Sequence, residues 1–242
     1  MLPDIKIIQH DGFYIVRDDL IEYGSKIRFI DDLIKSLPYD EIVFGSSPRW
    51  GYGQISLSYI CKKYGKKFTL FLAESKDYHE YTQRAIDLGA NVIGVNPGYL
   101  KVTEKRAKDY VSENSQNRFL FPIGVEHPSV LESIKRTVES INFVPDHVWT
   151  ASSSGTLHRG LSLGWPTAEI HAVSVGHEMD ERQRGRAIIH KTKYKFQQIP
   201  KEDELPPFPC AKHYEGKVWQ VMKEYYITNT KPEKVLMWNV GK

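Results

Sequence analysis

A short run of small and hydroxyl-bearing residues has the composition of an anion-binding loop. It reads Ala151-Ser-Ser-Ser-Gly-Thr156 and lies between a predicted buried strand and a predicted helix. Small residues let backbone amides approach an anion, hydroxyls add donors, and the start of a helix adds partial positive charge. The run lacks both the G-x-G-x-x-G spacing of dinucleotide sites and the Gly-Lys-Ser/Thr of a Walker loop. It therefore predicts either a phosphate site or a serine-rich turn that caps a helix.

Lys26 stands where a cation is electrostatically unfavourable. It begins a predicted helix over residues 26–35, whose apolar positions fall on one face and whose N-cap we expect to be Ser25. The positive end of the helix dipole disfavours a lysine there. Near a bound phosphate cofactor, however, the same setting suits an amine that forms a Schiff base. The alternative is an ordinary solvated lysine.

A carboxylate and an aromatic ring stand together before the last predicted helix. Tyr214 and Glu215 occur in His213-Tyr-Glu-Gly-Lys217, and the helix is expected over residues 218–226. The glutamate could be a capping residue, or a charge placed beside a stacking ring.

The elements that must position these residues alternate between strand and helix. A hairpin over 5–9 and 13–17 precedes them, turning at His10-Asp-Gly12. The predicted strands are 41–44, 68–72, 91–95, 118–121, 147–150, 169–175 and 235–238, and the predicted helices include 53–64, 77–88, 103–113 and 127–140. Glycine just past a helix, followed by a β-branched run, is typical of a βαβ crossover. The sequence therefore predicts an α/β fold with open parallel sheets covered by helices, and a polar surface segment from Asp180 to Pro209.

Composition narrows the class of protein. The 242 residues are 40% hydrophobic and 26% charged, with a net charge of +3, as in an ordinary globular protein. Two cysteines, Cys61 and Cys210, exclude a disulfide framework and a cysteine-based zinc site. The nine histidines make no i, i+4 zinc pattern with an acidic partner, so we expect no metal. Without a membrane-length apolar run or a signal-peptide pattern, we expect a cytoplasmic protein.

Taken together, these segments resemble the fold-type II pyridoxal-phosphate-dependent enzymes of the tryptophan synthase beta-like superfamily. They are similar in particular to the branch that contains 1-aminocyclopropane-1-carboxylate (ACC) deaminase and D-cysteine desulfhydrase. Residues 23–28 correspond to Gly-Gly-Asn-Lys-x-Arg, residues 152–156 to the phosphate loop, and residues 214–217 keep Tyr-Glu-Gly-Lys unchanged. Residues 235–241 resemble the final strand and Gly-Gly of the family. The resemblance runs in register from about Phe13 to Gly241.

The resemblance implies pyridoxal 5'-phosphate (PLP) as the cofactor and gives each of these residues a role. Lys26 holds the cofactor as an internal aldimine, Glu215 pairs with the pyridine nitrogen, and Tyr214 lies against the cofactor and takes part in catalysis. The further cofactor-binding residues are Ser152, Ser153, Ser154, Gly155, Thr156 and Asn239. Residues 1–39 and 126–242 would form a large cofactor domain and residues 40–125 a small α/β domain, with the cofactor between them. Such enzymes are usually homodimers.

Carbanion chemistry at an amino-acid α-carbon is the implied activity: deamination, elimination or decarboxylation, as in a PLP-dependent lyase or deaminase. Lys26 and Tyr214 would carry the protons.

The loop that binds the substrate carboxylate in the family departs from its pattern here. Its Ser-Asn pair becomes Ser47 followed by Pro48, which has no donor, and Arg49 could act as the clamp instead. Trp50 and Tyr52 would complete a substrate-binding loop, or the loop could simply be packed. A basic run from Arg182 to Lys195, interleaved with aromatics, predicts either a phosphate-backbone contact or a solvated charged face.

Three functions therefore stay open. The first is PLP chemistry on a free amino acid or a derived amine. The second is a PLP-dependent decarboxylase or isomerase acting on an amino acid appended to a DNA base, as in DNA modification, with stacking aromatics around the base. The third is a non-catalytic PLP-binding protein, against which the retained Tyr214 and Glu215 argue.

Overall fold

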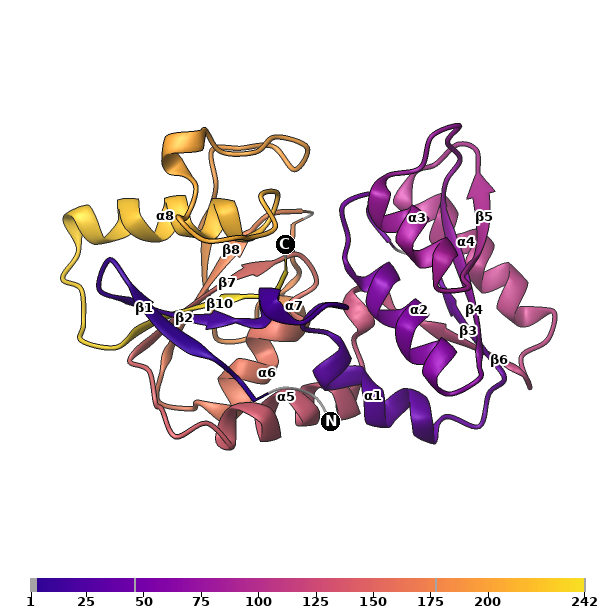
Figure 1. Ribbon diagram of the computed structural model, residues 1–242, viewed down its shortest axis with the longest axis horizontal. Coiled ribbons are helices and arrows are strands. Elements are labelled where there is room, and N and C mark those ends of the chain that lie inside the picture. Colours follow the sequence, from indigo (N-terminus) through magenta and orange to yellow (C-terminus); the bar gives the residue numbers. More distant parts are fainter. Residues whose placement is uncertain (1–3, 46, 177, 242) are drawn as a thin grey trace. The chain divides into compact units, whose positions relative to one another are not determined.

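Two sheets, each in a unit of its own, organise the computed structural model, which describes residues 4–45, 47–176 and 178–241 (Figure 1). Unit 1 consists of Met1–Arg28 and Pro128–Lys242, and unit 2 of Phe29–His127. Both sheets have the predicted α/β architecture, because apolar strands alternate with helices that cover them. Within the described ranges, none of the helices combines the length and the apolar character that a membrane crossing needs.

The sheet of unit 1 has six strands in the order β1-β2-β10-β7-β8-β9. They are β1 Ile7–His10, β2 Phe13–Arg17, β7 His147–Ser152, β8 Glu169–Ser174, β9 Ile188–Lys191 and β10 Val235–Asn239. Only β1 is antiparallel to its neighbour. Asp11 and Gly12 turn this hairpin with φ of 50° and 74°, as the Asp-Gly signal predicts.

Helices cover both faces of this sheet. In unit 1 they are α5 Pro128–Glu139, α6 Thr156–Gly164, α7 Glu181–Arg184 and α8 Glu215–Thr228, with short turns η1 Asp18–Leu20 and η3 Glu202–Glu204. On one side, α8 packs Val218, Trp219 and Met222 against Ile15 and Trp149 of the sheet. On the other side lie α5 and α6 (Figure 1).

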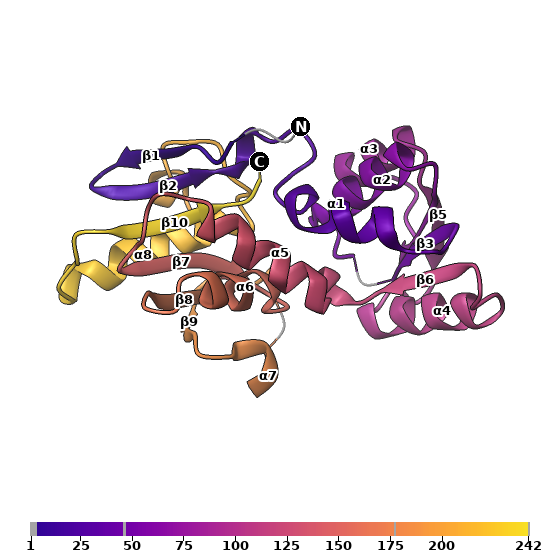
Figure 2. The same cartoon turned by 90° about the horizontal axis from the view of Figure 1, so that it is seen from below.

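Unit 2 has a four-stranded, all-parallel sheet in the order β5-β4-β3-β6. The strands are β3 Glu41–Phe44, β4 Lys67–Ala73, β5 Asn91–Val95 and β6 Arg118–Phe121, and the helices are α2 Gly53–Lys63, α3 Glu80–Asp87 and α4 Leu100–Ser112, with a short turn η2 Ile123–Val125. Figure 2 shows α4 on one side of the strands and α2 and α3 on the other. Ala107 of α4 packs against Val43, Phe71 and Val95 of the sheet.

Two features differ from the prediction. The helix α1, Ile27–Ser36, belongs mostly to unit 2 and not to the large domain, because Asp31 accepts hydrogen bonds from Lys63 Nζ (2.9 Å) and Tyr64 Oη (3.0 Å). The boundary therefore falls after Arg28 and not after residue 39. The predicted surface segment contains α7 and the edge strand β9, which extends the sheet beside β8.

Candidate active site

The carboxyl ends of the parallel strands of unit 1 bring the predicted cofactor residues to one edge of its sheet. Asn239 at the end of β10 pairs with Arg17 at the end of β2, and Ser152 at the end of β7 pairs with Ser174 of β8. In open α/β sheets, ligands bind outside this edge. The loop to Lys26 follows β2, and the predicted phosphate loop follows β7.

Two buried aspartates shape the loop that leads to Lys26. Both carboxylate oxygens of Asp19 accept hydrogen bonds from the Arg17 guanidinium, at 2.7 and 2.8 Å. Asp18 accepts from the Ser25 hydroxyl at 2.7 Å and from Arg28 Nε at 3.0 Å. Paired carboxylates of this kind fix the course of the chain where no regular structure does.

Ser25 has a different role from the predicted helix cap. Its hydroxyl donates to Asp18, and its amide donates to the carbonyl oxygen of Val240 at 3.2 Å. The helix begins one residue later than predicted, at Ile27, so Lys26 precedes it. Lys26 is thereby held beside the carboxyl end of β10.

Lys26 is half-buried as a residue, and its amine has an altered acidity. Burial lowers the pKa of Lys26, and the negative charge of Glu215 opposes that shift. A lowered pKa increases the share of neutral amine, which is the nucleophilic form. The interaction with Glu215 brings together two residues that are far apart in the sequence.

Glu215, the first residue of α8, is a fully buried carboxyl with neither oxygen hydrogen-bonded among the described residues. Burial raises the pKa of Glu215 to about 8. Its own backbone amide and the charge of Lys26 oppose this shift, and the charge of Asp19 adds to it. A buried polar group without a partner is costly and rare in folded proteins. The carboxyl therefore fits a ligand that presents a protonated ring nitrogen to it.

Asn239 joins the end of β10 to this group. Its amide Nδ2 donates to Asp19 Oδ1 and to the carbonyl oxygen of Pro209, both at 2.9 Å. Its Oδ1 is buried and, among the described residues, has no hydrogen-bond partner. Asn239 thus holds Asp19 and the segment before α8 in place and retains one acceptor.

The predicted phosphate loop is tightly built around Gly155. This residue precedes α6 with a φ of +81°, and a Cβ added to it would lie 2.1 Å from the carbonyl oxygen of Gln183. Only glycine therefore fits there. The hydroxyl oxygens of Ser154 and Thr156 lie 3.2 Å apart at the start of α6, where backbone amides are unpaired within the helix.

Ser152 contributes differently from its neighbours in that loop. Its hydroxyl lies 2.9 Å from His158 Nδ1 and donates to Met179 Sδ at 3.2 Å. The other His158 nitrogen, Nε2, lies 3.1 Å from the Arg184 carbonyl oxygen, and burial lowers the pKa of His158 to about 4. Ser152 and His158 thereby connect the loop to the segment around α7. The sequence does not predict this connection.

Tyr214 and Lys217 lie at the start of α8. The Tyr214 ring packs edge-on against Phe196, with 5.7 Å between ring centroids. The Lys217 ammonium is fully buried and donates to the carbonyl oxygens of Lys195 (2.9 Å) and Phe196 (3.1 Å). Lys217 belongs to the Tyr-Glu-Gly-Lys motif but has no role predicted from the sequence, although it shares with Lys26 the signal of a cation at a helix start.

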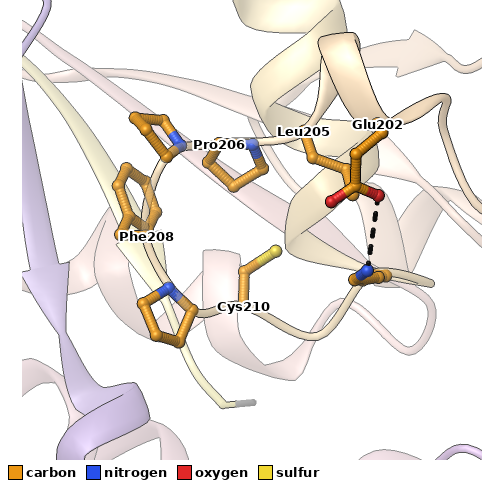
Figure 3. Close-up of a pocket in the computed structure, with 8 residues that line it drawn as sticks. Glu202, Leu205, Pro206, Phe208 and Cys210 are labelled. Atoms are coloured by element: carbon orange, nitrogen blue, oxygen red, sulfur yellow. Dashed lines mark ion pairs between the residues drawn. The ribbon is translucent and has the colours of Figure 1, made fainter.

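A pocket of about 660 Å³ in unit 1 is lined by the segment that precedes Tyr214 and Glu215 (Figure 3). Its lining consists of Glu202, Leu205, Pro206, Pro207, Phe208, Pro209, Cys210 and Lys212. Burial raises the pKa of the Cys210 thiol to about 12, and the charge of Glu215 acts in the same direction. Cys210 is therefore a neutral thiol between the pocket and the buried carboxyl.

The four predicted substrate-binding residues all lie in unit 2, in the loop before α2. Ser47 is buried and donates to the Pro48 carbonyl oxygen at 3.4 Å. Tyr52 is packed, because its hydroxyl accepts from Arg84 at 3.1 Å and its ring contacts Tyr81. Trp50 is half-buried and Arg49 is exposed. This favours the packed-loop alternative for Tyr52.

Gln54 holds the same loop and was missed by sequence reasoning. Its Nε2 donates to the Gly51 carbonyl oxygen at 3.0 Å, and its Oε1 accepts from the Thr82 hydroxyl at 2.8 Å. The buried glutamine thereby ties residues 49–51 to α3.

Two cations of the basic run from Arg182 to Lys195 make contacts within the chain. Arg186 donates to the carbonyl oxygens of Ala168 (2.8 Å) and Trp165 (2.7 Å). Lys193 pairs with Glu204 (2.6 Å) and Glu224 (3.3 Å). Because Arg186 and Lys193 already have partners within the chain, they are less suited to bind phosphates. The segment therefore supports the solvated-face alternative better than a phosphate-backbone contact.

Comparison with known proteins gives one curated relative and several solved structures, while no protein-family model matches the chain. The relative is the glycyl-dTMP PLP-dependent decarboxylase of Pseudomonas phage M6, 23% identical over 249 residues that cover 90% of this chain and 87% of the relative. An ACC deaminase homologue has a TM-score of 0.85 at 17% identity, covering 99% of this chain and 90% of its own.

Two further structures align over nearly the whole chain. O-ureido-L-serine synthase bound to O-ureido-L-serine has a TM-score of 0.68 at 14% identity, covering 97% of this chain and 86% of its own. A hydrogen sulfide-producing enzyme from Fusobacterium nucleatum has a TM-score of 0.63 at 14% identity, covering 99% and 94%. The fold is that of the fold-type II PLP-dependent enzymes, as the sequence predicts.

Proposed function

We propose that this chain is a PLP-dependent enzyme that stabilises a carbanion at or next to an amino-acid α-carbon. The observation that carries the proposal is the buried carboxyl of Glu215, which has no hydrogen-bond partner among the described residues and interacts with the charge of Lys26. The fold and the PLP-dependent relative support the same cofactor. When bound, PLP supplies an electron sink for a carbanion on an attached amine.

The residues of unit 1 divide the work of holding that cofactor. Lys26 would bind it covalently through its amine. Ser153, Ser154, Thr156 and the amides around Gly155 would bind its phosphate, and Ser152 and His158 would keep the loop in shape. Glu215 would hold a proton on the ring nitrogen, because a carboxylate raises the pKa of an adjacent cation.

Two residues are proposed to move protons. Lys26 has a lowered pKa, so a larger share of its amine is in the neutral form that can accept a proton. Tyr214 carries the second acid or base group, and its position before α8 makes it the sequence neighbour of Glu215.

We further propose that the amino acid is carried on a nucleotide and that the reaction is a decarboxylation. The PLP-dependent relative named for glycyl-dTMP supports this, since its match spans nine-tenths of the chain. The exposed guanidinium of Arg49 is suited to a phosphate or carboxylate group. The basic run adds little, because Arg186 and Lys193 are committed to intramolecular contacts.

Substrate competition tests the proposal. PLP-loaded protein is incubated with glycyl-dTMP, free glycine, D-cysteine or ACC, and products are identified by mass spectrometry. We expect loss of CO2 from glycyl-dTMP only, none with Lys26→Ala, and a raised KM with Arg49→Gln. Equal turnover of free amino acids would contradict the nucleotide-linked substrate. Bound cofactor without turnover of any substrate would support the non-catalytic alternative.

A further inference from the structure

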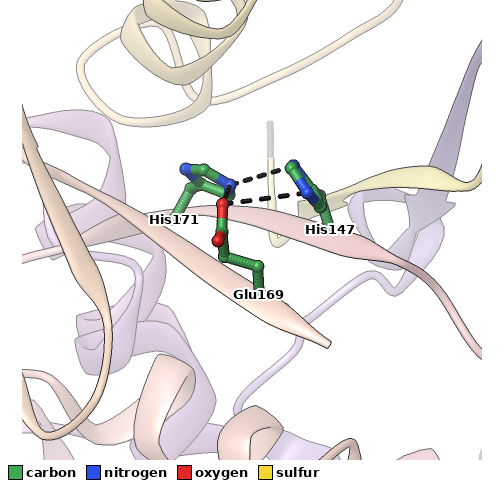
Figure 4. A group of neighbouring side chains, drawn as sticks. All are labelled: His147, Glu169 and His171. Carbon is green, nitrogen blue, oxygen red and sulfur yellow. Dashed lines mark hydrogen bonds and ion pairs between the residues drawn. The ribbon is translucent and has the colours of Figure 1, made fainter. Parts of the chain in front are cut away.

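A second cluster of chemistry-bearing side chains lies at the opposite edge of the unit 1 sheet. His147 and Glu169 are the first residues of β7 and β8 and face each other in register, and His171 follows two residues after Glu169. Figure 4 shows the three side chains pointing toward one another. Since β7 has six residues, its two ends lie roughly 16 Å apart, so this cluster is separate from the phosphate loop.

The ligand atoms have the spacing of a metal-binding set. Glu169 Oε1 lies 2.9 Å from His171 Nε2 and 3.7 Å from His147 Nε2. The other nitrogen of His147, Nδ1, lies 3.1 Å from His171 Nε2 and 2.8 Å from the Tyr226 hydroxyl oxygen. One ligand atom from each residue falls within 4.8 Å of the others. Ligands of a tetrahedral zinc ion at about 2.0–2.1 Å stand about 3.3 Å from one another.

We propose that His147, Glu169 and His171 form a binding site for a divalent transition metal ion such as zinc. Two imidazole nitrogens and one carboxylate oxygen are the ligand set of several zinc sites that keep a further position open. The site lies in unit 1 alone and is independent of the cofactor proposed above.

Surrounding residues fix the orientation of His171. Its Nδ1 lies 2.9 Å from His190 Nε2, and its ring stacks on Trp149 with 4.3 Å between centroids and 2° between planes. A metal-ligating histidine commonly donates its second ring N–H to an acceptor, which sets the tautomer and the direction of the free nitrogen, and His190 Nε2 takes the place of that acceptor here. Only Nε2 of His171 then faces His147 and Glu169.

Access from solvent suits a metal as well. His171 is fully buried, whereas the side chains of His147 and Glu169 are 20% and 45% exposed, which leaves a route from solvent.

Metal titration of the tag-free, full-length protein tests the site. After dialysis against a chelator, zinc binding is followed by calorimetry and cobalt binding by visible absorption. We expect one equivalent of either ion, and a rise in Tm with zinc. Glu169→Gln and His147→Ala should each weaken binding at least tenfold, and His190→Gln should weaken it by about 10–100-fold as a positioning residue.

His10→Ala is the matched control, because His10 Nδ1 also lies beside a carboxylate, Asp11, at 3.2 Å, but without a third ligand among the described residues. It should bind zinc like the wild type. Circular dichroism confirms that each variant is folded. The proposal is overturned if the wild type binds no zinc at micromolar concentration, if Glu169→Gln and His147→Ala both bind it unchanged, or if cobalt gives a thiolate charge-transfer band.

Discussion

At the scale of single residues, the unusual feature is the fully buried carboxyl of Glu215, which has no hydrogen-bond partner in the described part of the chain. Glu215 lies within electrostatic reach of Lys26 and Asp19, yet neither of its oxygens accepts a hydrogen bond among the described residues. Such a group destabilises the protein unless a ligand pairs with it. A loss of stability in the cofactor-free protein is therefore expected for a site that pairs its carboxyl with a cationic ring nitrogen.

That loss of stability should be visible as a pH dependence of the cofactor-free protein. The pKa of Glu215 rises from 4.5 to about 8 on folding, so the folded chain retains a proton that the unfolded chain releases in this range. The free energy of unfolding should therefore fall as pH rises through it, by up to about 1.4 kcal/mol per pH unit. Glu215→Gln should remove this contribution, measured by urea unfolding between about pH 5 and about pH 8.

Glu233→Gln, at an exposed position, is the control and should keep the wild-type slope. Parallel profiles for the wild type and Glu215→Gln would show that the carboxyl does not titrate as described.

Tyr214 is open to a separate test at the same scale. Tyr214→Phe keeps the ring packed on Phe196 and removes only the hydroxyl. We expect the variant to bind PLP normally, with kcat reduced by about 10²–10⁴ and KM little changed, as for loss of a general acid or base. An unchanged kcat would remove Tyr214 from the proposed proton transfers.

At the scale of elements, the site depends on loops whose shape is fixed by a few contacts. Gly155 is the sharpest case, because its φ is +81° and an added Cβ would lie 2.1 Å from the Gln183 carbonyl oxygen, so both exclude a side chain. Gly155→Ala should weaken PLP binding at least tenfold and lower the free energy of unfolding by roughly 1–3 kcal/mol. Fluorescence titration with PLP and urea unfolding measure the two effects.

Gly89→Ala is the control that separates the effect of backbone strain from the effect of the close contact between an added Cβ and Gln183. Gly89 also has a positive φ, +100°, but an added Cβ would meet nothing within 4 Å. It should cost about 1–2 kcal/mol of stability and leave PLP affinity unchanged. Equal PLP affinities for the two variants would contradict the role given to the loop.

Lys217 performs a similar task for the segment before η3. Lys217→Met removes both donors to the carbonyl oxygens of Lys195 and Phe196, so we expect a loss of about 1–3 kcal/mol of unfolding free energy. Lys223→Met, on the same helix, breaks an exposed pair with Asp11 and should cost about 1 kcal/mol or less. Similar losses for both would mean that the buried contacts contribute little.

How far the sequence predicts the structure depends on where the deciding interactions lie. The hairpin at Asp11-Gly12 and the parallel sheets built from alternating strands and helices follow from local signals and are confirmed. The unit to which α1 belongs does not follow from local signals, because Asp31 of α1 pairs with Lys63 on another helix. The strand β9 was missed because it is short and sits in a polar stretch.

The site shows the same division. Lys26, Glu215 and Asn239 were predicted from motif residues, and the structure brings them to the same edge of one sheet. The use of the Ser152 hydroxyl and the meeting of His147 with His171 were not predictable, because both depend on strand register and on side chains from other segments.

At the scale of the whole molecule, the two ends of the chain build one unit, and the residues between them along the sequence form the second. β10, the last strand, lies between β2 and β7, so the sheet of unit 1 is complete only when the last residues are in place. The predicted cofactor residues belong to this unit, and the loop with Ser47 and Arg49, predicted to bind substrate, belongs to the other.

The most direct test of the central claim is to identify the lysine that holds the cofactor. PLP-loaded protein is reduced with borohydride, digested, and mapped by mass spectrometry. We expect one cofactor per chain, attached at Lys26, and an absorption band at about 420 nm that is absent from Lys26→Ala. Attachment at another lysine with a lowered pKa, such as Lys217, or no stoichiometric attachment at all, would contradict the account.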